Sequence, residues 1–389
     1  MADNRYNKRS MGKEPQRRGP ISEKDVYRSA ASGYRRKKFG GANMAVVLCS
    51  VLLISALAAS VWHIATMERP RDTKQDMIEQ SLNAEKGDVQ TEEKAEAEFD
   101  TLTLTAADVH TGDLILVNYE NEYVFPADES ALVNVYQNKT ENYSVAYNDY
   151  LLDGDVLSEF SGFMAELSDV TGDSCILVNS TYRSLESQQN IYDSYVQSNG
   201  EEYAKNYVAD PGKSEHHTGL ALDLTVRYAD GTYVLMKNYE NLETLNTLCV
   251  EYGFIQRYPD NKYYYTHINT EPWHYRYVGV PHAYVIAKKS FCLEEYITFM
   301  RDYTVDGEML LLNETGDFAT CDKTSLPENG YVLYYVPENV SGDTEVMIPD
   351  GCTDYTVSGN NCDGFVVAVL MGESELPEAS FPTPSKEVQ

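Results

Sequence analysis

One uninterrupted apolar stretch dominates the hydrophobic pattern near the N-terminus. No Asp, Glu, Lys or Arg occurs between Phe39 and Met67, and about 20 consecutive apolar residues are enough to cross a bilayer as a helix. The basic run at 35–38 comes directly before this stretch, and such runs stay on the cytoplasmic side of a membrane. We therefore expect a single-pass transmembrane anchor over 41–67, with a cytoplasmic N-terminus and an extracellular remainder.

The segments on either side of this stretch differ in charge. Residues 1–40 have a net charge of +8 although the whole chain has −30, and they have little to bury, as expected of a basic cytoplasmic tail. Residues 68–104 are rich in Glu, Asp, Lys and Gln, which favours an acidic stalk or linker. A secretory signal peptide cleaved near 56–58 is the alternative to the uncleaved anchor.

Beyond the stalk, helical and strand periodicities alternate up to about residue 300. Apolar residues at helical spacing, with capping residues before them, predict helices over 155–171 (capped by Asp155), 185–198 (capped by Ser184), 239–252 and 282–300. Short apolar or alternating runs predict strands over 113–118, 175–179, 220–226 and 263–266. The mixture indicates an α+β domain over 105–300.

The C-terminal part has a different texture. Runs such as 331–336 and 364–370 are separated by turn residues, which predicts a small all-β module over 301–380 followed by a loose tail over 381–389. The acidic body argues against a nucleic-acid partner, which requires a basic surface. Six cysteines follow the apolar stretch, and they are equally compatible with three disulfides and with free thiols.

Two clusters supply the residue types of a metal-dependent hydrolase. His216 and Asp223 lie in one cluster, and Glu271 and His274 lie in the other. Two imidazoles and one carboxylate form a suitable ligand set for catalytic zinc. A second carboxylate beside the metal can act as a general base. These residue types alone are common, and no HExxH motif accompanies them.

The residues around these clusters resemble those of the VanY-type D-alanyl-D-alanine carboxypeptidases, zinc peptidases related to the VanX-type dipeptidases. Four blocks occur in the order typical of that family, and the resemblance covers roughly residues 110–290. The blocks are Ser180-Thr-Tyr-Arg-Ser184 with Gln188 and Tyr192, Ser214-x-His-x-x-Gly-x-Ala-x-Asp223, Phe254-Ile-Gln-Arg-Tyr-Pro259, and Glu271-Pro-Trp-His-Tyr-Arg-Tyr-Val-Gly279.

The resemblance implies a role for each matching residue. One zinc ion per catalytic domain is held by His216, Asp223 and His274, and Glu271 is the general base. Arg183 stabilises the developing oxyanion or holds the substrate carboxylate. The implied substrate-binding residues are Ser214, Gln188 and Tyr182. The implied fold is an antiparallel sheet with flanking helices that carries the zinc site, as in the D,D-peptidase and hedgehog-like proteins.

Two positions depart from the family pattern. His217 stands where relatives often have Gln, and His267 stands where they usually have Gly. His217 is therefore a competing metal ligand by type, although its spacing from Asp223 favours His216. A bulky imidazole at position 267 is expected to narrow the pocket or shift its specificity.

The resemblance implies removal of the terminal D-Ala from the pentapeptide stems of peptidoglycan. A peptidoglycan endopeptidase or a D,D-dipeptidase on the same scaffold is one alternative. A catalytically silent wall-binding scaffold protein, in which the β module is the working part, is the other. Apart from peptidoglycan and the membrane, no partner is indicated by the sequence.

Overall fold

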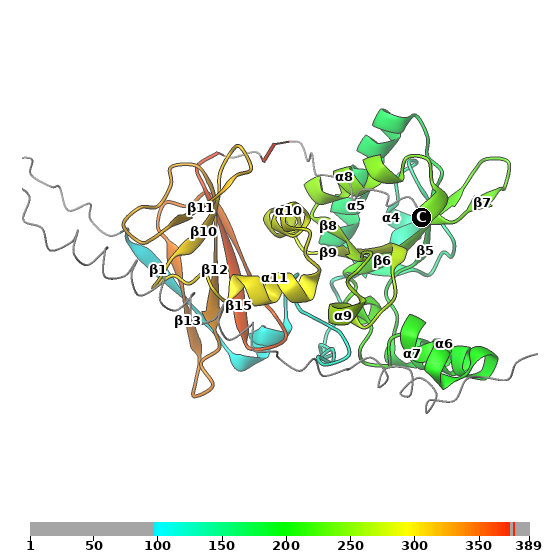
Figure 1. Ribbon diagram of the computed structural model, residues 1–389, viewed down its shortest axis with the longest axis horizontal. Coiled ribbons are helices and arrows are strands. Elements are labelled where there is room, and N and C mark those ends of the chain that lie inside the picture. Colours follow the sequence, from blue (N-terminus) through cyan, green and yellow to red (C-terminus); the bar gives the residue numbers. More distant parts are fainter. Residues whose placement is uncertain (1–96, 374–375, 378–389) are drawn as a thin grey trace, which may run out of the picture. The chain divides into compact units, whose positions relative to one another are not determined.

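The computed structural model describes residues 97–373 and 376–377 (Figure 1). Within these residues, no helix combines the length and the apolar character needed to span a bilayer. The sequence segments that lie wholly or largely outside the described residues are the tail over 1–40, the anchor over 41–67, the stalk over 68–104 and the tail over 381–389.

Six strands form the sheet that carries the candidate site. Their order is β3-β5-β6-β9-β8, with β7 paired to β6, and every pair is antiparallel except β3 with β5. The largely antiparallel sheet of the expected α+β architecture is therefore confirmed. The strands are β3 (Ser144–Val145), β5 (Ile176–Ser180), β6 (Ala221–Arg227), β7 (Tyr233–Val234), β8 (Phe254–Tyr258) and β9 (Glu271–Tyr277).

Helices and two short strands surround this sheet. The pair β2 (Leu132–Asn134) and β4 (Leu151–Asp153) is antiparallel. The α-helices are α4 (Val135–Asn138), α5 (Gly154–Thr171), α6 (Leu185–Asn199), α7 (Glu201–Tyr207), α8 (Leu242–Glu251), α9 (Tyr263–Thr266), α10 (Val280–Lys289) and α11 (Leu293–Met300). The 3-10 helices are η1 (Ala106–His110), η2 (Glu215–Thr218) and η3 (Met236–Asn238).

The longest helix in the described residues, α5, follows its sequence pattern closely. Its six buried residues are the apolar ones at helical spacing from Val156 to Leu167. The cap differs from the expectation, because the side chain of Asp153, and not that of Asp155, accepts the backbone N–H groups of residues 155 and 156. Ser184 caps α6 as predicted. The single helix expected over 282–300 is two helices, separated at Ser290, which has a positive φ of 54°.

A five-stranded antiparallel sheet forms the C-terminal part, in the order β11-β10-β12-β15-β14. Residues 99–104, which the sequence places at the end of the stalk, form β1 (Phe99–Leu104) and pair with β13 (Thr344–Pro349). The other strands are β10 (Met309–Leu312), β11 (Phe318–Cys321), β12 (Gly330–Pro337), β14 (Asp354–Gly359) and β15 (Gly364–Met371).

This C-terminal sheet buries both faces. Successive strand residues point to opposite faces, and along β12 the side chains of Val332 and Tyr334 enter one core while Leu333 and Tyr335 enter the other. The core that contains Leu333 and Tyr335 also contains the buried residues of the site-bearing sheet. Helices α10 and α11 lie between the two sheets (Figure 1). The two sheets are therefore parts of one packed structure.

Residues 113–118 are buried as predicted, but they do not form a strand. Their backbone groups find partners other than a strand ladder: Leu114 N–H donates to Ser358 Oγ (2.8 Å), and Leu116 N–H donates to the Asn360 carbonyl (3.1 Å). The guanidinium of Arg276 donates to the carbonyls of Asp113 and Ile115. Because these partners satisfy the buried backbone N–H and C=O groups, the segment does not need to pair with a strand.

The tyrosine run 263–266 was expected to be a strand and is the short helix α9. His267 ends it in the left-handed conformation (φ 56°), and its backbone N–H donates to the carbonyl of Tyr263. The three tyrosines are exposed. The preference of tyrosine for strands reflects packing on a half-buried sheet surface, and these side chains do not pack on such a surface.

No disulfide links the six cysteines in the described part of the chain. Four of them are buried, and the Sγ of Cys362 lies 3.4 Å from Asn121 Oδ1. The structure thus contains free thiols at all six positions.

Candidate active site

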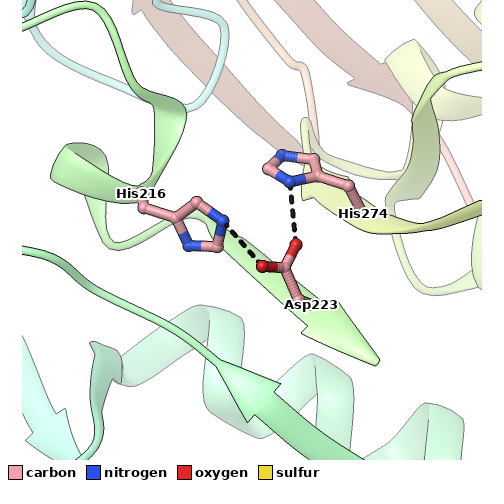
Figure 2. Close-up of side chains that lie close together, drawn as sticks. All are labelled: His216, Asp223 and His274. Atoms are coloured by element: carbon pink, nitrogen blue, oxygen red, sulfur yellow. Dashed lines mark hydrogen bonds and ion pairs between the residues drawn. The ribbon is translucent and has the colours of Figure 1, made fainter. Parts of the chain in front are cut away.

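Three side chains from different elements converge on one point (Figure 2). His216 comes from η2, Asp223 from β6 and His274 from β9, and Asp223 and His274 are register partners on adjacent strands. Asp223 Oδ2 lies 3.3 Å from His216 Nε2, and Asp223 Oδ1 lies 3.0 Å from His274 Nδ1. One ligand atom from each residue lies within 4.8 Å of the other two. The structure thus brings together the three residues expected to bind metal.

The turn from η2 into β6 sets the spacing of His216 and Asp223. The hydroxyl of Ser214 accepts the backbone N–H of His216 at the start of η2. Gly219 ends η2 with a φ of 74°, and a Cβ there would lie 2.6 Å from Leu132. Glycine is favoured by both the left-handed conformation and the close approach. The chain can therefore reverse sharply and enter the sheet two residues later.

The hydrogen bonds of His216 determine which nitrogen faces the site. Its Nδ1 lies 2.7 Å from the carbonyl oxygen of Thr181, so Nδ1 carries the proton and donates it. The lone pair is then on Nε2, the atom that points to Asp223. Burial lowers the pKa of His216 to about 4, which keeps the imidazole neutral and able to bind a metal.

His217 is a structural residue rather than a competing ligand. Its Nε2 accepts the backbone N–H of Gly212 (3.1 Å), so its Nδ1 donates to the carbonyl of Arg183 (2.7 Å). Both ring nitrogens are thus used within the fold, and the ring packs near Tyr123 and Phe125. The choice of His216 as the metal-facing histidine agrees with this geometry.

Glu271 lies beside the three converging residues without belonging to them. It is buried, and its Oε2 is 3.8 Å from His274 Nδ1. Burial raises the pKa of Glu271 to about 7, against the attraction of His274. A carboxyl group with a pKa near neutrality is suited to accept and return a proton.

Arg183 spans one side of the site. Its guanidinium donates to Ser180 Oγ (2.9 Å), Gln188 Oε1 (3.2 Å) and Asp223 Oδ2 (2.9 Å). Gln188 is itself buried and donates to the carbonyl of Ala209 (2.8 Å). These contacts fix the planar guanidinium at the rim of the site while about a fifth of the side chain remains exposed.

The site opens into a cavity of about 150 Å³. Arg183, Gln188, Ser214 and Glu271 line it together with the three converging residues and with Tyr258, Ile268 and Trp273. Tyr182 does not line the cavity, and its hydroxyl donates to Glu129 (2.7 Å). The structure therefore brings every expected site residue to the cavity except Tyr182.

His267 does not narrow this cavity. Its side chain is exposed and stacks on Tyr119, with ring centroids 3.8 Å apart. Its left-handed backbone is the conformation that glycine adopts most readily. The glycine usual in the family therefore matches a backbone requirement, and the neighbouring Ile268 is the residue that faces the cavity.

A buried ion network beneath the site was not expected. Glu215 is 1% exposed and accepts hydrogen bonds from Arg257 Nε (2.7 Å) and Arg276 Nη1 (2.9 Å). Arg257 also forms two hydrogen bonds with Glu294. Glu215, Arg257 and Arg276 all stand within the motif blocks, so their positions were visible in the sequence, but only the fold shows that they meet.

The donor set fits a divalent metal ion. One nitrogen from each imidazole and one oxygen of Asp223 lie within 4.8 Å of one another, near enough for small side-chain movements to bring all three onto one metal ion. The surroundings also favour a positive charge at this place. Burial lowers the pKa of His274, but the carboxylates of Asp223 and Glu215 outweigh burial and raise this pKa to about 9. Nitrogen and oxygen donors in this geometry suit zinc.

Two imidazoles, one carboxylate ligand and a separate buried carboxyl group beside a cavity are the features of a metal-dependent hydrolase. Comparison with known proteins agrees. A family model described as VanY, D-alanyl-D-alanine carboxypeptidase, matches residues 151–280. A D-alanyl-D-alanine carboxypeptidase of Enterococcus faecium is 30% identical over 277 residues, which cover 70% of this chain and 80% of that relative. The chain belongs to the VanY-type D-alanyl-D-alanine carboxypeptidase family.

Two further similar proteins are named for a dipeptidase activity, one of them together with the carboxypeptidase activity. The bifunctional D-Ala-D-Ala dipeptidase and D-Ala-D-Ala carboxypeptidase VanXYC of Enterococcus gallinarum is 36% identical over 122 residues, 31% of this chain and 64% of that protein. The crystal structure of the vancomycin resistance D,D-dipeptidase VanXYg, in complex with a D-Ala-D-Ala phosphinate analogue, shares 32% identity and has a TM-score of 0.58. That match covers 70% of this chain and 99% of the other, so it extends well beyond the residues of the family model.

Proposed function

We propose that this chain is a zinc-dependent D-alanyl-D-alanine carboxypeptidase that removes the terminal D-Ala from the pentapeptide stems of peptidoglycan. His216, Asp223 and His274 would hold one zinc ion. Zinc bound there supplies Lewis acidity toward the scissile carbonyl and toward water. Family membership supports the activity, and the donor set supports the metal.

The observation that carries this proposal is the buried Glu271, close to the three metal-binding side chains but outside their group. Because its pKa is raised to about 7 by burial, it can accept a proton from the attacking water. The same carboxyl group then returns that proton to the amine of the leaving D-Ala. A single residue thereby serves both proton transfers.

Arg183 provides the positive charge that the substrate needs. Its guanidinium lines the cavity next to Asp223, where it neutralises the developing oxyanion or pairs with the carboxylate of the terminal D-Ala. Ser214 also lines the cavity, and its hydroxyl proton is available for the substrate terminus because its oxygen accepts from His216.

The test uses the full chain purified in detergent and a muramyl pentapeptide that ends in D-Ala-D-Ala. Mass spectrometry should show loss of a single D-Ala. Chelation should abolish this loss, and added zinc should restore it. Turnover that survives complete removal of metal would contradict the proposal.

A D,D-dipeptidase activity is the second candidate, because VanXYC is named for both activities and VanXYg for the dipeptidase. Free D-Ala-D-Ala as the substrate in the same assay distinguishes the two. Cleavage of the pentapeptide alone supports the carboxypeptidase, and cleavage of the free dipeptide alone supports the second candidate. Cleavage of both indicates a bifunctional enzyme.

We also propose that residues 41–67 anchor the enzyme in the cell membrane, with residues 1–40 in the cytoplasm and the catalytic part outside. The charge-free stretch and the basic residues before it support this arrangement. Protease treatment of intact cells that express the full chain should remove the catalytic part and leave a fragment of the tail protected. Release of the catalytic part into the medium without protease would instead favour the cleaved signal peptide.

A further inference from the structure

The buried Glu215 faces the ring of His274 on the side away from Asp223. Glu215 Oε2 lies 3.4 Å from His274 Nε2. Both atoms are fully buried, and neither has a hydrogen-bond partner in the described part of the chain. Two complementary buried atoms that face each other without a bond would be costly if they stayed unpaired.

The position of Glu215 is fixed by two buried cations. Its other oxygen, Oε1, accepts from both Arg257 and Arg276, and each arginine is 0% exposed. One carboxylate oxygen is thus held by both arginines, and the other lies toward His274.

Each arginine is in turn held by a different part of the fold. Arg276 Nη2 donates to the carbonyls of Asp113 (2.7 Å) and Ile115 (3.0 Å), in the buried segment before the site-bearing sheet. Arg257 donates to both oxygens of Glu294 on α11. Glu215 is therefore anchored from two directions, and its free oxygen has little room to turn away.

The two histidines of the site differ in the group behind the ring. His216 donates from Nδ1 to the carbonyl of Thr181 and presents Nε2 to the site. His274 presents Nδ1 to the site and turns Nε2 toward Glu215. An imidazole that binds metal through one nitrogen carries its proton on the other, and a carboxylate behind that proton orients the ring and makes it a stronger ligand.

We propose that Glu215 is a positioning residue for the metal: it accepts the Nε2 proton of His274 and so directs Nδ1 of that ring at the metal ion. This inference rests on the proposed function, because it requires a metal bound by His274. It assigns the buried Arg257–Glu215–Arg276 network a task in metal affinity in addition to its part in packing.

The first test uses the unaltered full chain loaded with zinc, with nitrogen-15 in its histidines. We expect the NMR spectrum of His274 to show a proton on Nε2 that is shifted downfield and exchanges slowly with water. The signal is assigned by its loss in His274→Asn. A proton on Nδ1 with zinc at Nε2, or an Nε2 proton that exchanges freely, would overturn the proposal.

The second test measures zinc affinity in Glu215→Gln by competition with a chelator. Loss of the carboxylate is expected to weaken zinc binding 10- to 100-fold. Glu294→Gln is the matched control, since it removes one negative charge from the same Arg257 without touching His274, and its zinc affinity should stay within about threefold of the unaltered chain. Thermal unfolding of both metal-free variants reports whether each is folded.

The outcomes distinguish a failure of the proposed function from a failure of the role of Glu215. If the unaltered chain binds no zinc, the proposed function fails and the inference fails with it. If the unaltered chain binds one zinc and Glu215→Gln binds it equally well, only the inference fails. If both glutamine variants lose affinity equally, the network acts through its charge and Glu215 has no positioning role. Should Glu215→Gln not fold, the NMR measurement on the unaltered chain decides.

Discussion

Asp223 and His274 are direct register partners on β6 and β9, and Asp223 Oδ1 lies 3.0 Å from His274 Nδ1 although 51 residues separate them in the chain. Antiparallel pairing places opposite side chains of one face about 5 Å apart. The sheet thus positions two residues of the candidate metal site, and the turn through Gly219 brings His216 back to Asp223. Asp223 and His274 gain their fixed positions from paired strands.

Replacement of Glu271 by Gln should remove the proposed general base and keep the shape of the cavity. We expect kcat to fall by about 10²- to 10⁴-fold, which is the usual contribution of such a group. Zinc content, measured by atomic absorption, should remain at one ion per chain because Glu271 lies outside the converging three residues. A variant that keeps most of its activity would rule out Glu271 as the base.

Arg183→Lys should impair turnover although it conserves the charge. An ammonium group cannot reproduce the three contacts that the guanidinium makes with Ser180, Gln188 and Asp223. We expect kcat/KM for the pentapeptide to fall at least about tenfold, a loss of about 1.4 kcal/mol in transition-state stabilisation. Arg227→Lys, at an exposed position on β6, is the matched control and should have little effect.

Asp113→Asn should stabilise the protein in a manner that depends on pH. Burial raises the pKa of Asp113 from 3.8 to about 6, against the attraction of Arg276. The folded state thus holds the proton more tightly than the unfolded state, so wild-type stability decreases as pH rises from about 4 to 6. The variant lacks this dependence, and urea unfolding at pH 7 should show it to be more stable by about 2 kcal/mol.

The advantage of Asp113→Asn should shrink as the pH is lowered toward 4.5. Asp149→Asn, at an exposed position, serves as the control and should change stability by less than about 0.5 kcal/mol at every pH. An advantage of Asp113→Asn that is the same at pH 4.5 and pH 7 would show that ionisation of Asp113 is not its cause.

Leu333→Ala should weaken the whole described part of the chain. Leu333 is 0% exposed and lies in the core that the C-terminal sheet shares with the site-bearing sheet, and such truncations cost about 2–5 kcal/mol. Calorimetry should show one transition at a lower temperature. Two transitions, with only one of them shifted, would mean that the two sheets unfold separately. Leu235→Ala, at a residue that is 62% exposed, is the matched control.

Local features of the fold followed the sequence where neighbouring residues decide the structure. The apolar spacing of α5 and the Ser184 cap of α6 are determined within a few residues. The predicted secondary structure was wrong where residues distant in the sequence determine the local conformation. Residues 113–118 are buried without a ladder because Arg276, Ser358 and Asn360 satisfy their backbone. Residues 263–266 form a short helix whose three tyrosines are exposed.

The chemistry of the site was predicted from the resemblance of its motifs to a known family. The blocks around His216, Asp223 and His274 indicated a metal-dependent peptidase because four such blocks occur in the order typical of the VanY-type carboxypeptidases. Tyr182 stands in the same blocks and yet binds Glu129 away from the cavity. A motif specifies which residues recur together, and it does not specify which way each side chain points.

The sequence by itself indicated the class of enzyme, the residues expected to supply its metal donors and its base, and the charge-free stretch that predicts an anchor. Only the tertiary structure decided that His217 is structural, that His267 points away from the cavity, and that Glu215 stands behind His274 between two buried arginines. The physical reason is that residue identity sets which bonds a side chain can form. Burial and the partners brought from distant parts of the chain decide which of those bonds are formed.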